Sequence, residues 1–425
     1  MPTVIVVGSG GREHALVHTL AASPSAPRVL AAPGNGGIRA RVPVEVSDIE
    51  GLVALASAEA ADLVVVGPEA PLVDGLADRL RKEGFAVLGP SREAARLEGS
   101  KAFAKTVMDE AGVPTARWGL FADPKDAKAF ARTLPGVVVK EDGLAGGKGV
   151  VVCGSHAEAD QAIDHHLSGR RGEGRHRIVI EERLDGEELS VIALSDGARL
   201  ALMAPSQDHK RVFEGDRGPN TGGMGAYSPA PRGTPELLAE IERCCLSPVL
   251  ERMAERGTPF SGFLYAGIML TSDGPKVLEY NVRLGDPETQ AVLPLLEEDA
   301  YTLFLAAARG ELDTTPLGFS KRAALTVVLA AEGYPGPVRQ GDRIEGLDQA
   351  EAHEDVLIFH AGTRREGDEL RTAGGRVLAV TGLGEDLDAA AVAAYRAVHP
   401  ITWPGCHYRR DIGFRALGRA VGEVL

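Results

Sequence analysis

Short apolar runs alternate with segments of helical periodicity over the first hundred residues of the chain. The apolar runs, rich in Val, Ile and Leu, lie at residues 3–7, 29–32, 62–66 and 85–88. Segments rich in Ala and Leu, such as 14–22 and 51–60, separate them. This alternation of strand-like and helix-like segments predicts a parallel sheet with helices on its faces.

After a further helix predicted at residues 100–111, the pattern changes to paired strands. Runs at 137–140 and 149–152 flank a glycine-rich turn, and runs at 262–270 and 276–280 flank the turn TSDGP, so each pair predicts an antiparallel hairpin. The remaining predictions are strands at 177–180, 323–330, 357–361 and 376–381 and a closing helix at 387–398. The chain is therefore expected to combine α/β and α+β architecture in several domains.

The charge balance is acidic, with 60 Asp and Glu residues against 46 Lys and Arg residues and a net charge of −14. Nucleic acid is disfavoured as the main partner, because phosphate backbones are bound by clustered Lys and Arg and the chain has no long basic stripe. No apolar run approaches the ~20 residues that cross a bilayer, and no basic leader precedes the first strand. We therefore expect a soluble, cytoplasmic protein. Glycine is in excess, at 52 of 425 residues, and its location becomes informative.

One group of glycines follows the first predicted strand, in the turn GSGGRE at residues 8–13. Such a turn opens a helix, where backbone N–H groups and the helix dipole attract a phosphate. A nicotinamide dehydrogenase is disfavoured, because Glu13 stands where the dinucleotide motif needs its third glycine and Pro33 stands near the expected acidic residue. Two later strands also end in polar or glycine-rich turns, at 33–37 and 67–71. A tight turn without ligand is the alternative for the first turn by itself, but the three turns together indicate a ligand crevice at one edge of the sheet.

A second group lies in KEDGLAGGKG at residues 140–149. The spacing is too short for a phosphate-binding P-loop, and Gly149 replaces the required Ser or Thr. A glycine hairpin bracketed by Lys140 and Lys148 can still fold over a triphosphate; a mobile surface turn is the alternative. The acidic run from Glu181 to Glu188 favours, by itself, a solvated edge.

Alternation in the strand after residue 276 places Glu279, Asn281 and Arg283 on one face. A carboxylate beside an amide carbonyl supplies the oxygen ligands that Mg²⁺ prefers, and the arginine can hold a phosphoryl or carboxylate group. A half-exposed edge strand is the ordinary alternative. Polar turns at 208–211, 218–225 and 285–290 add groups with little reason to lie in a core.

In this order, the segments resemble the phosphoribosylamine-glycine ligase family of the ATP-grasp superfamily. The resemblance spans the chain and rests on GSGGREH at 8–14, GPEAPL at 67–72, DHKR at 208–211, PNTGGMGAY at 219–227, FHAGT at 359–363 and GGRVL at 374–378. It implies a Rossmann-like N-terminal domain at 1–100, an ATP-grasp domain at 101–323 with a mobile small subdomain at about 118–190, and a mixed α/β C-terminal domain at 324–425. It also implies a purine-synthesis enzyme, expected to be a monomer, that joins glycine to 5-phosphoribosylamine using ATP and Mg²⁺ or Mn²⁺.

The resemblance assigns roles to individual residues of this chain. By this resemblance, Lys140 and Lys148 bind the ATP phosphates, assisted by Lys101 or Lys105. The segment with Glu181, Glu182 and Leu184 binds adenine, and Glu188 binds the ribose. The metal ion falls to Glu279 and Asn281. Glycine and its acyl phosphate are bound by Arg283, Asp286, Asp208 and Lys210, and Lys148 and Arg283 assist phosphoryl transfer. Phosphoribosylamine is bound by Gly11, Arg12, Glu13 and Glu69.

Two departures and two rivals stay open. Gly146 replaces the family's usual alanine in the hairpin, and the strand predicted at 262–270 lacks the acidic residue that often holds a second metal ion. Another ATP-grasp ligase or carboxylase of purine synthesis would share the nucleotide site and use a different acceptor. A nucleotide-binding regulator would keep the lysines but have no use for Glu279 and Asn281.

Overall fold

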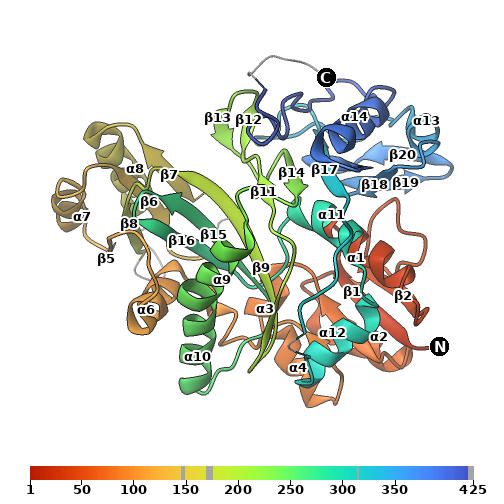
Figure 1. Cartoon of the computed structure of the whole chain (residues 1–425), viewed down its shortest axis with the longest axis horizontal. Coiled ribbons are helices and arrows are strands. Elements are labelled where there is room, and N and C mark those ends of the chain that lie inside the picture. The colour runs from red at the N-terminus through yellow and green to blue at the C-terminus, as the bar shows by residue number, and fades with distance from the viewer. Residues whose placement is uncertain (145–148, 169–175, 314, 420–425) are drawn as a thin grey trace.

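The first parallel sheet forms where the apolar runs predict it. The computed structural model describes residues 1–144, 149–168, 176–313 and 315–419 (Figure 1). The sheet pairs its strands in the order β2-β1-β3-β4, all parallel. Their bounds are Thr3–Gly8 for β1, Arg28–Pro33 for β2, Leu63–Val66 for β3 and Val87–Leu88 for β4. Every residue of β1 and β3 is buried, as expected for strands covered on both faces.

Helices connect these strands and then lead out of the sheet. They are α1 (Gly11–Ala21), α2 (Ile49–Ala58), α3 (Glu69–Val73), α4 (Leu76–Lys82), α5 (Arg96–Gly99) and α6 (Lys101–Ala111). The predicted helix at 100–111 is confirmed, with Ser100 as its N-cap, because the hydroxyl accepts a hydrogen bond from the N–H of Phe103. Gly112, at φ +67°, ends it in the left-handed conformation that suits glycine.

A small sheet with its own hydrophobic core follows, at the left of Figure 1. Its strands pair antiparallel in the order β5-β8-β6-β7, and α7 and α8 pack against it. The bounds are Trp118–Phe121 for β5, Pro124–Ala131 for α7, Val137–Glu141 for β6, Val150–Cys153 for β7, His156–Ser168 for α8 and Ile178–Glu182 for β8. The predicted hairpin of β6 and β7 is confirmed, and its tip at 145–148 lies outside the described residues.

A central sheet pairs in the order β10-β9-β15-β16. The bounds are Glu187–Asp196 for β9, Leu200–Leu202 for β10, Ser261–Thr271 for β15 and Gly274–Asn281 for β16. The hairpin of β15 and β16 is confirmed, whereas β9 was not predicted. Ser190 and Ser195 interrupt the apolar pattern of β9, but both hydroxyls are hydrogen-bonded in the core, to the Tyr265 hydroxyl and to the Phe260 carbonyl.

The helices around the central sheet complete this part of the molecule. They are α9 (Pro235–Ile241), a π-helical turn (Glu242–Leu246), α10 (Ser247–Glu255), α11 (Glu288–Val292), a 3₁₀ turn (Leu293–Leu295) and α12 (Ala300–Arg309). Helix α12 contacts β4, β9 and β15 and so joins the central sheet to the N-terminal one.

The last sheet pairs in the order β11-β14-β17-β21-β18 and is covered by α14. The bounds are Gln207–Asp208 for β11, Gly225–Ser228 for β14, Ala323–Ala330 for β17, Val356–His360 for β18, Arg376–Gly384 for β21, Leu347–Glu351 for α13 and Leu387–Val398 for α14. Two further hairpins are β12 (Arg211–Phe213) with β13 (Arg217–Asn220), and β19 (Thr363–Glu366) with β20 (Glu369–Thr372). This sheet includes two strands from the polar segment 207–228, so it anchors that segment.

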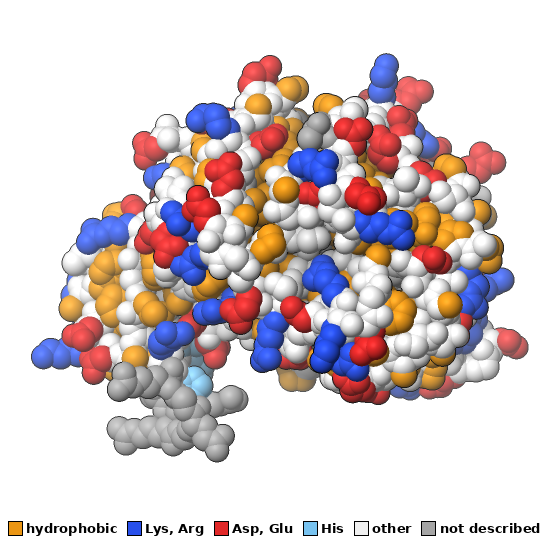
Figure 2. Space-filling model, turned by 90° about the horizontal axis from the view of Figure 1, so that it is seen from below, with side chains coloured by type: hydrophobic (Ala, Val, Ile, Leu, Met, Phe, Trp, Pro, Cys, Tyr) orange, Lys and Arg blue, Asp and Glu red, His pale blue; other side chains and the backbone are white. Residues whose placement is uncertain are grey.

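No helix of the described part of the chain is long and apolar enough to cross a membrane. On the face seen in Figure 2, acidic and basic side chains are interspersed.

Candidate active site

Two of the four lysines predicted to hold ATP phosphates, Lys140 and Lys105, meet at one buried carboxylate. Glu181, at the end of β8, accepts a 2.9 Å hydrogen bond from Lys140 Nζ of β6, and Lys105 Nζ of α6 lies 3.2 Å from the same oxygen. Burial opposes ionisation of Glu181, but the two ammonium groups outweigh it and lower the pKa of the carboxyl group. Burial also lowers the pKa of Lys105 to about 8. Glu181 is therefore not part of a solvated edge, because the pairing of β8 with β6 brings it to Lys140 and α6 brings Lys105 to it.

The two lysines of α6 have different surroundings. Lys105 is buried and its ammonium also donates to the Thr115 hydroxyl, so it supports Glu181 from within. Lys101, one helical turn away, donates a 2.8 Å hydrogen bond to the carbonyl of Gly143, at the base of the glycine hairpin. The side chain of Lys101 therefore connects helix α6 to the glycine hairpin. Lys148 lies outside the described residues.

The predicted adenine and ribose residues lie on and between β8 and β9. Glu182 ends β8, Leu184 is half-buried in the connecting loop, and Glu188 is the second residue of β9. The Glu188 carboxylate forms an ion pair with Lys210, whose ammonium also lies 4.0 Å from Asp208. Burial, reinforced by neighbouring carboxylates, raises the pKa of Asp208 to about 7. The predicted ribose and glycine residues therefore meet at Lys210.

Glu279 and Asn281 lie at the end of β16, next to Lys140. Lys140 Nζ donates to the Leu278 carbonyl at 3.2 Å, at a bulge that interrupts the pairing of β15 and β16. Burial opposes ionisation of Glu279, but Lys210, Lys140, Lys101 and Arg283 together lower its pKa. Strand β16 ends at Asn281, so the prediction that Arg283 belongs to the same strand is wrong. The position of Arg283 is therefore set by the partners of its side chain and not by backbone pairing within a strand.

The donor set fits a divalent cation that is shared with a phosphate. Glu279 and Asn281 supply one carboxylate and one amide oxygen, and no cluster of three or more His, Cys, Asp or Glu side chains suited to a metal ion occurs within the described residues. Mg²⁺ is usually held by one or two carboxylates together with substrate phosphates. The set therefore suits a cation that arrives with a nucleotide.

In the N-terminal turn, Glu13 folds back over the glycines. Its carboxylate accepts hydrogen bonds of 2.6 Å from the N–H of Gly10 and from Nε of Arg12. A Cβ atom at Gly8 would lie 2.5 Å from the Glu13 side chain, and one at Gly67 would lie 2.2 Å from it, so these positions require glycine. The turns after β1 and β3 therefore meet, and Glu13 occupies the helix terminus that a dinucleotide phosphate would use.

Arg283 joins the N-terminal turns to the central sheet. Its guanidinium donates to Glu69 at 3.1 Å, to Glu98 at 2.8 Å and to Asn281 at 3.3 Å. Arg12 donates to the carbonyl of Leu284, next in the chain. Burial opposes the charge of Arg283, but Glu98 and Glu69 keep its pKa above the usual value. The residues predicted for the two acceptor substrates are therefore in direct contact.

Asp286 lies where the N-terminal turn, helix α11 and strand β21 of the C-terminal sheet meet. It pairs with Arg376 of β21 at 3.1 Å, and its other oxygen accepts a 2.7 Å hydrogen bond from Gln290 of α11. A Cβ atom at Gly10 would lie 3.3 Å from the Asp286 carboxylate, so the N-terminal turn borders it. Burial opposes ionisation, but Arg376 and Arg12 lower the pKa of Asp286.

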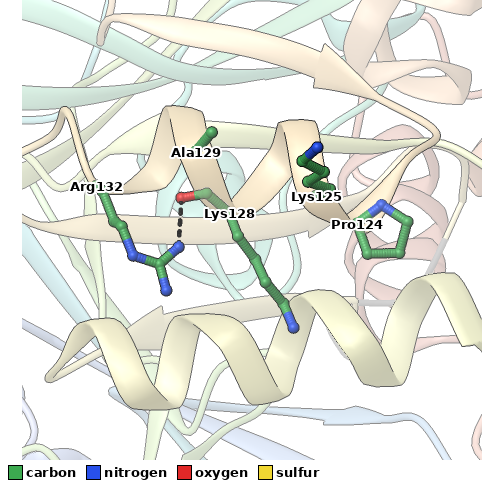
Figure 3. Close-up of a pocket in the computed structure, with 5 residues that line it drawn as sticks. All are labelled: Pro124, Lys125, Lys128, Ala129 and Arg132. Carbon is green, nitrogen blue, oxygen red and sulfur yellow. Dashed lines mark hydrogen bonds between the residues drawn. The ribbon is translucent and has the colours of Figure 1, made fainter.

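A separate hollow of about 560 Å³ lies along α7 and is lined by Pro124, Lys125, Lys128, Ala129 and Arg132 (Figure 3). Lys128 and Arg132 form ion pairs with Asp164 and Asp160 of α8. None of the predicted site residues lines this hollow.

The chain was compared with families of known proteins. Residues 2–98, 99–289 and 324–415 match the models of the N domain, the ATP-grasp (A) domain and the C domain of phosphoribosylglycinamide synthetase. The chain belongs to the phosphoribosylglycinamide synthetase family. It is thus an ATP-dependent ligase with the ATP-grasp fold, a fold that uses ATP with a divalent metal ion.

Individual members of the phosphoribosylglycinamide synthetase family are similar over the whole length. Phosphoribosylamine-glycine ligase of Caulobacter vibrioides is 50% identical over 421 residues, which is 98% of each chain. The crystal structure of phosphoribosylamine-glycine ligase from Thermotoga maritima is 35% identical, with a TM-score of 0.84 over 96% of this chain and 100% of that one. Biotin carboxylase from Campylobacter jejuni, 15% identical with a TM-score of 0.71 over 96% of this chain and 92% of that one, shares the fold.

Glu98 and Arg376, which form ion pairs with predicted site residues, were not among the sequence predictions. Glu98 lies two residues before a helix cap, in a segment with no motif. Arg376 lies in the motif GGRVL. A charged residue at the start of an apolar strand is the sequence signal that could have identified it. Both contact predicted site residues only through the tertiary fold.

Proposed function

We propose that the chain joins glycine to 5-phosphoribosylamine through a glycyl phosphate, with conversion of ATP to ADP and phosphate. The observation that carries this proposal is the position of Arg283, which contacts the candidate metal ligand Asn281 and the candidate amine-site residue Glu69. A single guanidinium thus borders the nucleotide region and the acceptor region. Membership of the ligase family supports the same reaction.

In the proposed first step, a carboxylate oxygen of glycine attacks the γ-phosphorus of ATP and the bond to ADP breaks. Lys140, Lys148 and Lys101 hold the phosphates, and Arg283 neutralises charge on the phosphoryl group during transfer. Lys105 supports this arrangement through Glu181. Glu279 and Asn281 would hold Mg²⁺ or Mn²⁺, which supplies further charge neutralisation at the phosphates when bound.

In the proposed second step, the amine of phosphoribosylamine attacks the carbonyl carbon of the glycyl phosphate. The new C–N bond replaces the C–O bond to phosphate, and phosphate leaves with the proton that the amine loses. Gly11, Arg12, Glu13 and Glu69 hold the amine substrate, while Asp208, Lys210 and Asp286 hold the glycyl part. The acyl phosphate is sensitive to water, so we propose that closure of the hairpin formed by β6 and β7 keeps water from it.

The remaining assignments concern nucleotide recognition and organisation. Backbone groups from Glu181 to Leu184 read adenine, and Glu188 exchanges its pairing with Lys210 for the ribose hydroxyl groups. Residues 1–100, 101–323 and 324–425 act as domains, with a small subdomain at about 118–190 that moves over ATP. The substrates are small molecules, and we propose a cytoplasmic monomer without nucleic-acid or membrane partners.

A coupled assay for ADP tests this function, with glycine and 5-phosphoribosylamine supplied separately and together. ADP release should depend on glycine, and labelled glycine should enter the product only when the amine is present. ADP release that ignores glycine and responds to bicarbonate would instead favour a carboxylase. ATP binding without any acceptor-stimulated turnover would favour a regulator.

A further inference from the structure

Glu98 is a buried carboxylate beside the candidate site that has no assigned role. It lies in α5, the short helix between the N-terminal sheet and α6, and its side chain is 9% exposed. One carboxylate oxygen accepts a 2.8 Å hydrogen bond from Nη2 of Arg283, and the other accepts a 2.7 Å hydrogen bond from the backbone N–H of Val282. Both oxygens are therefore directed at consecutive residues of one segment.

The two contacts lie just beyond the end of β16, where strand pairing no longer fixes the backbone. Strand β16 ends at Asn281, so the N–H of Val282 lies beyond the ladder that pairs β16 with β15. Glu98 supplies the acceptor that a neighbouring strand would otherwise offer. The same carboxylate fixes the backbone before Arg283 and one arm of its guanidinium. Two constraints from one group define a direction for the side chain that neither would define alone.

The other side-chain partners of Arg283 belong to the reacting parts of the site. Glu69 is a candidate for the amine substrate and Asn281 for the metal ion, so both have other ligands in the proposed cycle. Glu98 is assigned to no ligand, and its second oxygen is held by the backbone. When substrates engage Glu69 and Asn281, Glu98 is the side-chain partner that stays.

We propose that Glu98 is a positioning residue, which holds the guanidinium of Arg283 against the phosphoryl group throughout the reaction. It acts through Arg283 and touches no substrate. The inference rests on the proposed function, because it needs Arg283 to act in phosphoryl transfer. Displacing a positioned group by about 1 Å can lower a rate by about 100-fold, so loss of this anchor should be visible in kcat.

A double-mutant cycle on Glu98 and Arg283 tests the proposal, using Glu98→Gln, Arg283→Lys and the double variant. Gln keeps the size of Glu98 but replaces one acceptor oxygen with an NH₂ group, so one of the two contacts loses its acceptor. Lys keeps a charge at 283 but loses the fork that Glu98 aligns. We expect Glu98→Gln to lower kcat for glycine-dependent ADP formation by about tenfold or more and to leave KM for ATP within about twofold. In the Arg283→Lys background, Glu98→Gln should change kcat by less than about twofold, because the group it orients is gone.

A merely structural carboxylate gives a different pattern. It would lower kcat by the same factor in both backgrounds, in step with a lower melting temperature, and this result would overturn the proposal. Glu93→Gln is the matched control, since Glu93 lies in the same segment with its side chain 59% exposed, and it should behave as the unmodified chain.

A second variant keeps the test informative if Glu98→Gln does not fold. Glu98→Asp keeps the charge but withdraws the carboxylate by one methylene, so it can keep only one of the two contacts, and kcat should fall while ATP binding holds. Normal kcat in a folded Glu98→Asp protein would also refute the positioning role. If the unmodified chain shows no glycine-dependent ADP formation, the proposed function fails; if it does and the Glu98 variants match it, only this inference fails.

Discussion

A histidine pair between the N-terminal and C-terminal parts of the chain, with His14 half-buried and His360 buried, makes stability depend on pH in a defined way. His14 lies on α1 and His360 ends β18, and the backbone N–H of His360 donates a 2.8 Å hydrogen bond to Nδ1 of His14. Nδ1 must be unprotonated to accept it. Burial, followed by the charges of His360 and His18, lowers the pKa of His14 to about 3. Burial lowers the pKa of His360 to about 4.

The size of the effect follows from proton linkage. Both pKa values lie below the ordinary value of 6.5, so an unfolded chain binds protons in a range where the folded chain does not. The stability that each neutral histidine contributes is complete above pH 6.5 and is lost as the pH falls toward the folded-state value. Between pH 7 and pH 5 the loss is about 2 kcal/mol for each histidine, from about 1.4 kcal/mol for each pH unit once the pH is below 6.5.

Fluorescence can follow unfolding of the C-terminal part of the chain, which contains His360. The chain has two tryptophans, and Trp403 is buried near the end of the chain while Trp118 lies in the small sheet. In a Trp118→Phe background, urea unfolding followed by Trp403 fluorescence at pH 7, 6 and 5 gives the free energy of unfolding. The double variant His14→Gln, His360→Gln should lose about 4 kcal/mol less than its parent between pH 7 and pH 5.

His399→Gln, at an exposed histidine, is the control and should follow the parent. A double variant whose pH dependence matches the parent within about 0.5 kcal/mol would refute the reasoning, because the imidazoles of His14 and His360 would then not be the groups whose protonation separates the two states.

Three further changes have expected outcomes that single measurements check. Arg409 is fully buried and pairs with Asp411 and Asp216, so Arg409→Met should lower the free energy of unfolding by about 3 to 5 kcal/mol in the same fluorescence assay, and a loss under about 1 kcal/mol would contradict it. Glu279→Gln should abolish glycine-dependent ADP formation, and full activity at limiting Mg²⁺ would remove the metal assignment. Arg12→Ala should raise KM for phosphoribosylamine and leave KM for ATP unchanged; a higher KM for ATP would show that the division of sites is wrong.

The long apolar strands were predictable because each carries its own pattern, whereas the short or polar strands β5, β10–β14, β19 and β20 were not predicted. The runs of β1, β3 and β17 are buried throughout and read as apolar without any partner. Strand β9 was missed because its serines are satisfied by groups far away in the chain, such as Tyr265. A local pattern cannot reveal a hydrogen bond that only folding creates.

The candidate site divides in the same way. Glycine turns, the alternation of Glu279 with Asn281 and the lysines around the hairpin are local features, and by itself the sequence determined these and the family they resemble. The tertiary structure decided how charges are shared: that Glu181 is buried between Lys140 and Lys105, and that Glu98 anchors Arg283 from 185 residues away. The physical reason is that a buried charge needs a partner, and the identity of that partner depends on which distant segments the sheets bring together.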